Sequence, residues 1–351
     1  MPLSGLKVLE LASVLAGPAV GTFLAELGAE VTKVENPKTG GDVTRSWKLA
    51  SENADVAISG YFASVNFGKE HRFLDLKDKT QLAEVQQLAS EADIIVANYR
   101  KGQAERFALD YKAVRAQNPK VIYGNISGFG PDKSRSAFDV VLQAETGYMF
   151  MNGQPTSEPT KMPVALIDVL AAHQMKEAIL LALLNREKSG EGALVEVSLF
   201  DAAVSALTNQ ASNWLMNSHI PQRMGSLHPN IAPYGEILKT KDGKMIVLAV
   251  GSDAQFQALC SVLVLSELPK DDRFLANQKR IENRTVLQQL LQAKAIEKLC
   301  NDLMNQFADR NVPAGVVKSL KEVFENESAQ RLVVEEGETK RVSQIAFKIS
   351  R

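Results

Sequence analysis

The sequence has 351 residues, of which 45% are apolar and 23% charged, as is typical of a globular protein with two domains. The 40 Lys and Arg residues nearly balance the 41 Asp and Glu residues, and a net charge of −1 argues against nucleic acid or an anionic membrane as the main partner. The two cysteines, Cys260 and Cys300, are too few for a disulfide framework or a four-cysteine zinc site. We therefore expect them to be small core residues, and we expect no bound metal.

The N-terminal residues lack the basic start and long apolar run of a signal peptide. The longest apolar run, AILLALL at 178–184, is far shorter than the ~20 residues that span a bilayer. We expect a cytoplasmic protein with no membrane partner.

The first 35 residues predict a β-α-β unit. A strand is expected at 6–11 and a second strand at 30–35. The helix between them, at 19–27, has Pro18 in its first turn and stops at Gly28. Such a unit is the usual start of a parallel sheet covered by helices.

The alternation of strands and helices continues to about residue 217. Further strands are predicted at 93–99, 120–130 and 192–200, and helices at 82–92, 108–119, 167–187 and 201–217. The helix at 167–187 is apolar almost all round, which predicts that it is buried.

The pattern changes near residue 224. Residues 235–250 predict a β-hairpin with Asp242-Gly243 at its tip, and amphipathic helices are expected at 253–264, 283–292 and 294–307. We predict a large domain at 1–223 plus about 331–351, and a smaller α+β domain at 224–330.

A dinucleotide site would require G-x-G-x-x-G directly after the first strand. The chain instead has Gly17-Pro18-Ala19-Val20-Gly21, about five residues beyond that strand. Neither a Walker A motif nor a G-x-S-x-G elbow is present. The sequence therefore disfavours an NAD(P) oxidoreductase, although Glu35 ends the second strand where a ribose-binding acid would lie.

Six segments instead resemble the class III CoA-transferase family, which includes formyl-CoA transferase, carnitine CoA-transferase and 2-methylacyl-CoA racemase. They lie at 6–47, 61–78, 92–130, 136–149, 162–202 and 228–244, and include LAGPAVGTFLAELGAEVTKVENP, ADIIVANYRKG, SAFDVV and VALIDVLAAHQ. The resemblance implies an α/β fold: a Rossmann-like large domain with a parallel sheet, a smaller α+β domain, and two chains interlocked as a homodimer. The linkers would lie near 202–230 and 310–340, and residues 342–350 would return as a strand to the large domain.

The resemblance identifies Asp168 as the catalytic nucleophile of a CoA-transferase. A carboxylate with an ordinary pKa of about 4 is ionised at neutral pH and can attack a thioester without a separate base. The products would be an aspartyl-acyl anhydride and then an aspartyl-CoA thioester. From the residues alone, Asp168 would be interpreted as a helix N-cap.

The resemblance also implies which residues contact CoA or acyl-CoA, the substrate that is exchanged with a carboxylic acid; no permanently bound cofactor is expected. The expected CoA-binding residues are Val14, Leu15, Ala16, Leu74, Lys77, Asn98, Tyr99, Arg100, Arg106, Phe138 and Asp139. Arg106 would hold a phosphate, and residues 14–16 would lie beside the thioester.

Two alternatives share the fold. An acyl-CoA racemase or epimerase needs a second proton-transfer group, which the racemases place as a histidine where this chain has Phe138. His173 lies roughly 140° round the helix from Asp168 and points elsewhere. A catalytically weak CoA-binding homologue is the other alternative, because the C-terminal tail is short and the substrate loop has Leu15 where formyl-CoA transferase has a glutamine. Asn36 replaces an arginine of that enzyme, which removes one phosphate contact. Lys38 or Arg45 could replace that arginine.

Overall fold

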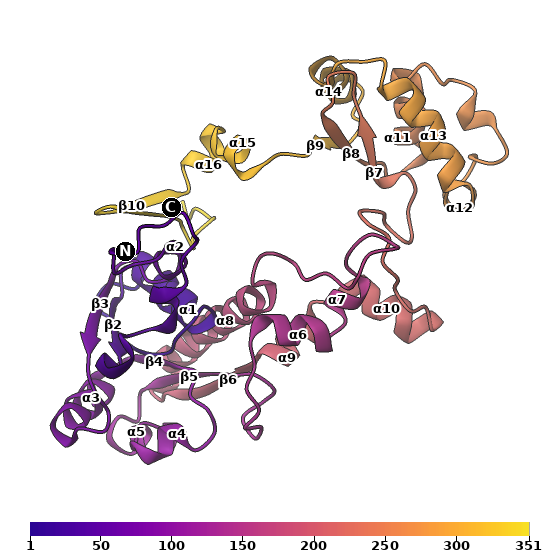
Figure 1. Cartoon of the computed structure of the whole chain (residues 1–351). Helices are drawn as coiled ribbons and strands as arrows, with labels where there is room; N and C mark the ends of the chain where they lie inside the picture. The colour runs from indigo at the N-terminus through magenta and orange to yellow at the C-terminus, as the bar shows by residue number, and fades with distance from the viewer. Residues whose placement is uncertain (351) are drawn as a thin grey trace. The chain divides into compact units, whose positions relative to one another are not determined.

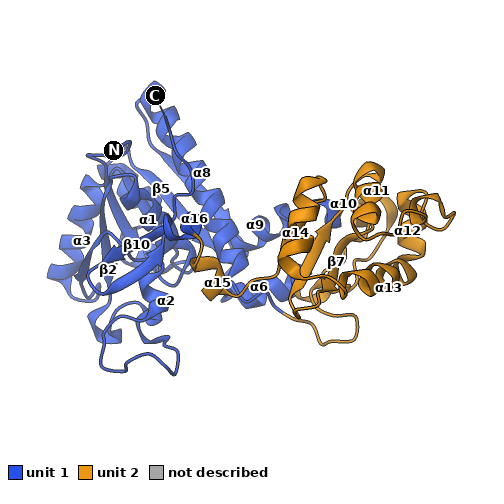
Figure 2. Cartoon of the chain, turned by 90° about the horizontal axis from the view of Figure 1, so that it is seen from above, with its two compact units in different colours: residues 1–148, 161–211, 327–351 blue, residues 149–160, 212–326 orange. Residues whose placement is uncertain are grey.

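A computed structural model describes residues 1–350 of the chain (Figure 1); residue 351, the end of the predicted large domain, lies outside the described residues. The chain divides into two compact units (Figure 2). The large unit comprises Met1–Tyr148, Lys161–Ala211 and the segment from Glu327 onward, and the small unit comprises Met149–Thr160 and Ser212–Asn326. The predicted division of the chain into two domains, with boundaries near residues 223 and 330, stays a prediction.

A six-stranded sheet forms the centre of the large unit, and all its neighbouring strands are parallel. Its order is β3-β2-β1-β4-β5-β6, with strands at Lys7–Leu11 (β1), Glu30–Glu35 (β2), Lys69–Phe73 (β3), Ile94–Ala97 (β4), Ile122–Ser127 (β5) and Ala193–Ser198 (β6). The predicted α/β fold with a parallel sheet is confirmed. The connections leave β1 and β4 in opposite directions, which makes the carboxyl ends of these two strands the expected ligand site.

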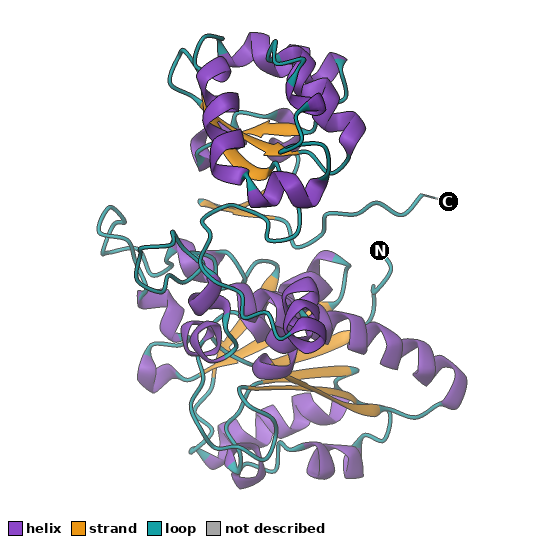
Figure 3. Cartoon of the chain, turned by 90° about the vertical axis from the view of Figure 1, so that its right-hand side faces the viewer, coloured by secondary structure: helices purple, strands orange, loops and turns teal. Residues whose placement is uncertain are grey.

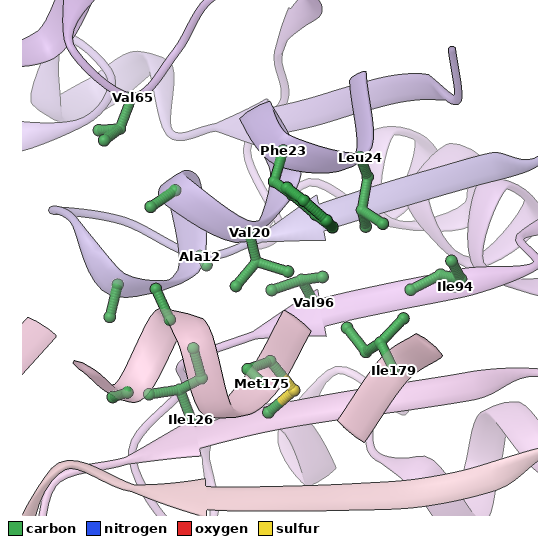
Figure 4. Close-up of a cluster of buried hydrophobic side chains, with 14 of the residues drawn as sticks. Ala12, Val20, Phe23, Leu24, Val65, Ile94, Val96, Ile126, Met175 and Ile179 are labelled. Atoms are coloured by element: carbon green, nitrogen blue, oxygen red, sulfur yellow. The ribbon is translucent and has the colours of Figure 1, made fainter. Parts of the chain in front are cut away.

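Two long helices cover one face of this sheet: α1 (Ala16–Glu26) and α8 (Leu166–Ser189). Val20 and Phe23 of α1 meet Met175 of α8 and Val96 of β4 in one apolar core (Figure 4). The opposite face, which includes Ile95, packs against α3 (Lys79–Glu91) and α5 (Tyr111–Gln117). The sheet is therefore buried on both sides, as an all-parallel sheet requires.

The prediction that helix 167–187 is buried all round is wrong for the single chain. Its buried residues follow a stripe four residues apart, from Ile167 through Ala171 and Met175 to Ile179. Leu181 and Leu184 are 67% and 60% exposed. Only one side of α8 packs on α1 and the sheet, so the remaining apolar residues stay on the surface.

The shorter helices of the first 205 residues are α2 (Gly60–Ala63), α4 (Gln103–Arg106), α6 (Asp139–Glu145), α7 (Tyr148–Met151) and α9 (Leu199–Ser205), with 3-10 turns at Pro37–Thr39 and Val43–Ser46. The single helix predicted at 201–217 is two helices. The first, α9, ends at Ser205, and α10 (Thr208–Asn217) begins at Thr208, whose φ of 43° interrupts the helical backbone.

The C-terminal segment differs from the predicted returning strand. After α16 (Glu327–Gln330), strands β10 (Val333–Glu336) and β11 (Thr339–Val342) pair only with each other. Residues 343–350 form no strand. The Glu26 carboxylate of α1 holds this segment instead, because it pairs with Arg341 and accepts hydrogen bonds from Ser343 and Gln344.

The small unit has an antiparallel sheet of β7 (Tyr234–Lys239), β8 (Met245–Ala249) and β9 (Ala314–Val316). Helices surround these strands (Figure 3): α11 (Asp253–Val262), α12 (Asn277–Glu282), α13 (Arg284–Ala295) and α14 (Cys300–Asp309), with a 3-10 turn at Leu268–Lys270. The short helix α15 (Leu320–Phe324) follows β9 in the chain. Gly243 turns the predicted hairpin with a φ of 78°. Cys260 and Cys300 are buried free thiols in this core, as predicted.

Among residues 1–350, no helix is long and apolar enough to cross a bilayer.

Candidate active site

A cavity of about 570 Å³ opens at the carboxyl ends of β1, β4 and β5 in the large unit. Its walls are Ser13–Ala16, which follow β1, and Asn98–Lys101, which follow β4. The lining also includes residues from the loop after β5, the start of α8, α4, the start of α5 and β6. The cavity therefore occupies the switch point of the sheet, where open α/β folds bind ligands.

Eight of the residues expected from the sequence line this cavity: Val14, Leu15, Ala16, Asn98, Tyr99, Arg100, Phe138 and Asp168. The lining does not include Leu74, Lys77, Arg106 or Asp139. Arg106 is exposed at the end of α4, directly after the lining residue Glu105, and Asp139 is buried next to Asp168's helix.

Asp168 lies in the first turn of α8 and is only 7% exposed. Ala165 occupies the N-cap position, so Asp168 is not the cap of this helix. No cation or hydrogen-bond donor among residues 1–350 pairs with its carboxylate. Burial and then the charge of Asp139 raise the pKa of Asp168 to about 7. The expectation of an ordinary pKa is therefore wrong, because it ignored burial and a second carboxylate.

Asp139, the first residue of α6, has both carboxylate oxygens engaged. Oδ1 accepts the backbone N–H of Ile167 at 2.7 Å, and Oδ2 accepts the Gln143 amide at 2.7 Å. The first bond links Asp139 to the residue directly before Asp168. Gln143 was not among the predicted site residues.

Tyr61, on α2, does not line the cavity, but the charges of Asp168 and Asp139 act on its hydroxyl. Burial, followed by the charges of Asp168, Asp139 and Asp42, raises the pKa of Tyr61 to about 12. Its hydroxyl thus stays protonated beside the carboxylates. Trp47 packs edge-on against its ring at a centroid distance of 5.2 Å. Only its position in the segment 61–78 could have drawn attention to Tyr61.

Three side chains from other segments of the chain hold the loop after β1 by hydrogen bonds. Lys33 Nζ donates to the Ala12 carbonyl at 2.6 Å, and the Asn98 amide both donates to and accepts from the Ser13 backbone at 2.9 and 3.1 Å. Asp42 Oδ2 accepts the Val14 N–H at 3.2 Å. Val14 has a φ of 74°, which is strained for a β-branched residue. Asn98 therefore positions this loop with the amide that was expected to contact CoA.

Asp42 belongs to a buried ion cluster, which we define as Glu10, Lys33, Asp42 and Lys69. Lys33 lies 2.8 Å from Glu10 and 3.1 Å from Asp42, and Lys69 lies 2.7 Å from Glu10. Burial alone would raise the pKa of Glu10, but the charges of Lys33 and Lys69 outweigh it and lower that pKa. The cluster thus keeps Glu10 ionised inside the protein.

The two cations suggested as replacements for the missing arginine have partners in the structure. Arg45 donates two hydrogen bonds to Glu35, at 2.8 and 2.6 Å, and stacks on Phe62. Lys38 pairs with Asp75 at 2.5 Å. Glu35 is thus committed to Arg45, which removes it as a ribose-binding acid. Within residues 1–350, no group of His, Cys, Asp or Glu side chains is placed to hold a metal ion.

Comparison with known proteins identifies the family of this site. The family described as CoA-transferase family III matches residues 3–349. A succinate–glutarate CoA-transferase of Agrobacterium fabrum is 36% identical over 94% of this chain and 83% of its own length. A succinyl-CoA:glutarate CoA-transferase of Mus musculus is 35% identical over 92% of this chain and 73% of its own length. The crystal structure of a CAIB/BAIF family protein from Brucella suis, 36% identical, superposes with a TM-score of 0.86 over 100% of this chain and 93% of that chain.

Proposed function

The chain belongs to CoA-transferase family III and is an enzyme of this class, and we propose that it transfers CoA between carboxylic acids through covalent intermediates on Asp168. The observation that carries this proposal is the buried Asp168 carboxylate, which faces the cavity at the carboxyl edge of the sheet without a cation to neutralise it.

The first half-reaction moves CoA onto the enzyme. An Asp168 oxygen attacks the thioester carbonyl of acyl-CoA, the C–S bond breaks, and CoA leaves as a thiolate. The thiolate then attacks the Asp168 carbonyl of the resulting anhydride and releases the first acid as its carboxylate. An aspartyl-CoA thioester remains, and no proton has been gained or lost.

The second half-reaction reverses these steps with another acid. The acceptor carboxylate attacks the aspartyl-CoA carbonyl and expels the thiolate, which forms a new anhydride. The thiolate then attacks the acyl carbonyl, giving the new acyl-CoA and free Asp168. Both intermediates are uncharged at Asp168, so each relieves the repulsion between Asp168 and Asp139 that raises the pKa of Asp168.

We propose that CoA follows the cavity from Asp168 across the ends of β1 and β4. Val14, Leu15, Ala16 and Phe138 would surround the thioester, and Tyr99 and Arg100 the pantetheine arm. The ADP part would extend beyond the cavity to Leu74, Lys77 and Arg106. A hydrogen bond to a charged phosphate contributes roughly 1.5–3 kcal/mol, so Arg106→Ala should weaken CoA binding about ten- to a hundredfold. Calorimetric titration, with exposed Arg115→Ala as the control, measures this loss; unchanged affinity would remove Arg106 from the site.

The acids are proposed from the relatives. Succinate and glutarate appear in the names of the relatives in Agrobacterium and mouse, and oxalate and mesaconate in the names of two others. We therefore propose a dicarboxylic acid as acceptor and succinyl-CoA as donor. Phe138, where a racemase would need a histidine, disfavours racemisation on the same fold.

The proposal is tested by incubation with succinyl-CoA alone, followed by digestion and mass spectrometry. We expect the peptide carrying Asp168 to gain the mass of CoA less water, and Asp168→Asn to gain nothing. Addition of glutarate should discharge the adduct as glutaryl-CoA. A protein that binds CoA with no adduct under these conditions would be a binding homologue, and racemisation of a 2-methylacyl-CoA would support the other alternative.

We also propose an interlocked homodimer as the working form. The exposed leucines of α8, Leu181 and Leu184, are of the kind that a second chain buries. Interlocked chains cannot separate without unfolding, so light scattering at nanomolar concentration should still give the mass of a dimer. A folded monomer would contradict this arrangement.

A further inference from the structure

Gln143 is a fully buried amide one helical turn after Asp139 on α6. Its Nε2 donates to Asp139 Oδ2 at 2.7 Å, and its Oε1 accepts the Met162 backbone N–H at 2.8 Å. The carbonyls of Met162 and Val164 lie 3.5 and 3.4 Å from Nε2. The amide thus ties Asp139 to the segment that leads into α8 and Asp168.

The Asp139 carboxylate is fixed from two directions. Gln143 holds one oxygen, and the Ile167 N–H holds the other. Both partners are donors, so each oxygen of the Asp139 carboxylate accepts one hydrogen bond. With both oxygens held, the carboxylate cannot turn away from Asp168.

We propose that Gln143 is a positioning residue for the transferase reaction: its amide holds the Asp139 carboxylate as a fixed anion beside Asp168. This inference rests on the proposed role of Asp168 as nucleophile. A fixed negative charge disfavours the free Asp168 carboxylate more than the neutral anhydride and thioester. It therefore makes Asp168 a stronger nucleophile and favours the loaded enzyme.

Asp168 is surrounded by several charged and titratable groups. The charge of Asp139, on α6, acts on Asp168, and the charge of Asp168 acts on Tyr61, on α2. The charged side chains that line the same cavity are Arg100, Lys101, Glu105, Asp110, Lys112, Asp132, Lys133, Arg135 and Glu196, of which Arg135 is paired with Glu145. After burial, the charge of Asp139 raises the pKa of Asp168. Gln143 controls that charge without lining the cavity itself.

The test is the pH dependence of kcat/KM in Gln143→Met, which keeps the side-chain volume but loses both hydrogen bonds. The Asp139 carboxylate can then rotate away from Asp168, so Asp168 remains ionised at lower pH. We expect the acidic limb of the kcat/KM–pH profile to move to lower pH by about one unit. The plateau kcat should fall about tenfold, and KM for acyl-CoA should stay within about twofold of the wild-type value. Gln174→Met, at an exposed site of α8, is the control and should leave the limb in place.

Asp139→Asn supplies a second measurement that does not depend on how well Gln143→Met folds. It should move the acidic limb down by itself, and adding Gln143→Met should move it no further. A limb that stays in place in Gln143→Met, or moves further in the double variant, would overturn the positioning role. An active Asp168→Asn would instead overturn the proposed function, so the two failures are distinguishable.

Discussion

Two groups of buried carboxylates lie in the large unit, and they have opposite electrostatic surroundings. In the buried ion cluster, Glu10 and Asp42 are neutralised by Lys33 and Lys69. At the cavity, Asp168 and Asp139 face each other without a cation bound to either carboxylate among residues 1–350. Burial opposes ionisation in both places, so burial does not distinguish them. The two groups differ in their lysines. The charges of Lys33 and Lys69 lower the pKa of Glu10, whereas burial and the charge of Asp139 raise the pKa of Asp168.

The difference separates a structural charge from a reactive one. A carboxylate paired with lysine is held ionised and is a poor nucleophile, because the cation stabilises its negative charge. A carboxylate beside another carboxylate gains by forming a neutral ester or anhydride. Substitutions in the two groups of carboxylates test this distinction.

The largest expected effect is on turnover in Asp168→Asn. An amide cannot attack a thioester, so we expect activity to fall by about 10⁴-fold, as for loss of other covalent nucleophiles. The melting temperature should not fall, because an unfavourable buried charge is removed. Assays of succinyl-CoA exchange alongside calorimetric melting measure both; a destabilised variant would show that Asp168 is structural.

Lys33→Met, unlike Asp168→Asn, should lower the stability of the protein. Lys33 is 1% exposed and bridges Glu10 and Asp42, so its removal leaves two buried anions undercompensated. Breaking a buried pair in this way costs about 3–5 kcal/mol of unfolding free energy. Lys294→Met, which removes an exposed pair with Glu297, should cost under about 1 kcal/mol. Urea unfolding of both variants provides the measurement, and equal losses would contradict the contrast.

Asp42→Asn is a milder change within the same cluster. The new amide oxygen still accepts the Val14 and Thr44 N–H groups, and Lys33 keeps Glu10. We expect a loss of roughly 1.5–3 kcal/mol, the range for a hydrogen bond to a charged group. The acidic limb of kcat/KM should not move, whereas Asp139→Asn should move it. A shifted limb in Asp42→Asn would mean that the two carboxylate groups are coupled.

The smallest effect concerns how stability depends on pH. The folded pKa of Asp168, about 7, lies above its unfolded value near 4, so the folded state holds the extra proton between these pH values. This group therefore stabilises the protein below about pH 4 and loses that contribution as pH rises through 7. Asp168→Asn should melt a few degrees above the wild type at pH 8 and at the same temperature at pH 4. A constant difference across this range would assign the raised pKa to another group.

The sequence predicted the order of elements well where local signals are strong. Pro18 and Gly28 bracket the first helix, and apolar runs mark β4 and β5. Strand β3 was missed because KEHRF is polar: it lies at the sheet edge, and Lys69 enters the buried ion cluster. The course of the C-terminal residues was also missed, since it depends on contacts with side chains far away in the sequence, Glu26 and Lys176.

Much of the candidate site could be predicted because it consists of residues just after strands β1 and β4. Its electrostatics could not, because the pKa of Asp168 depends on burial and on Asp139, which is far away in the sequence. Asn98 illustrates the same limit. Its position at a strand end indicates a ligand contact, but its amide is used to hold Ser13.

The anchoring of the loop after β1 matters for redesign of substrate range. Lys33, Asn98 and Asp42 hold the backbone of residues 12–14, and all three belong to other segments of the chain. The loop's shape is thus encoded outside the loop, so its own side chains can be exchanged without rebuilding its path. Ser13 and Leu15, which line the cavity, can therefore be substituted while the loop backbone keeps its conformation. Libraries that vary these two positions while preserving the three anchors offer a compact route to transferases for new acids.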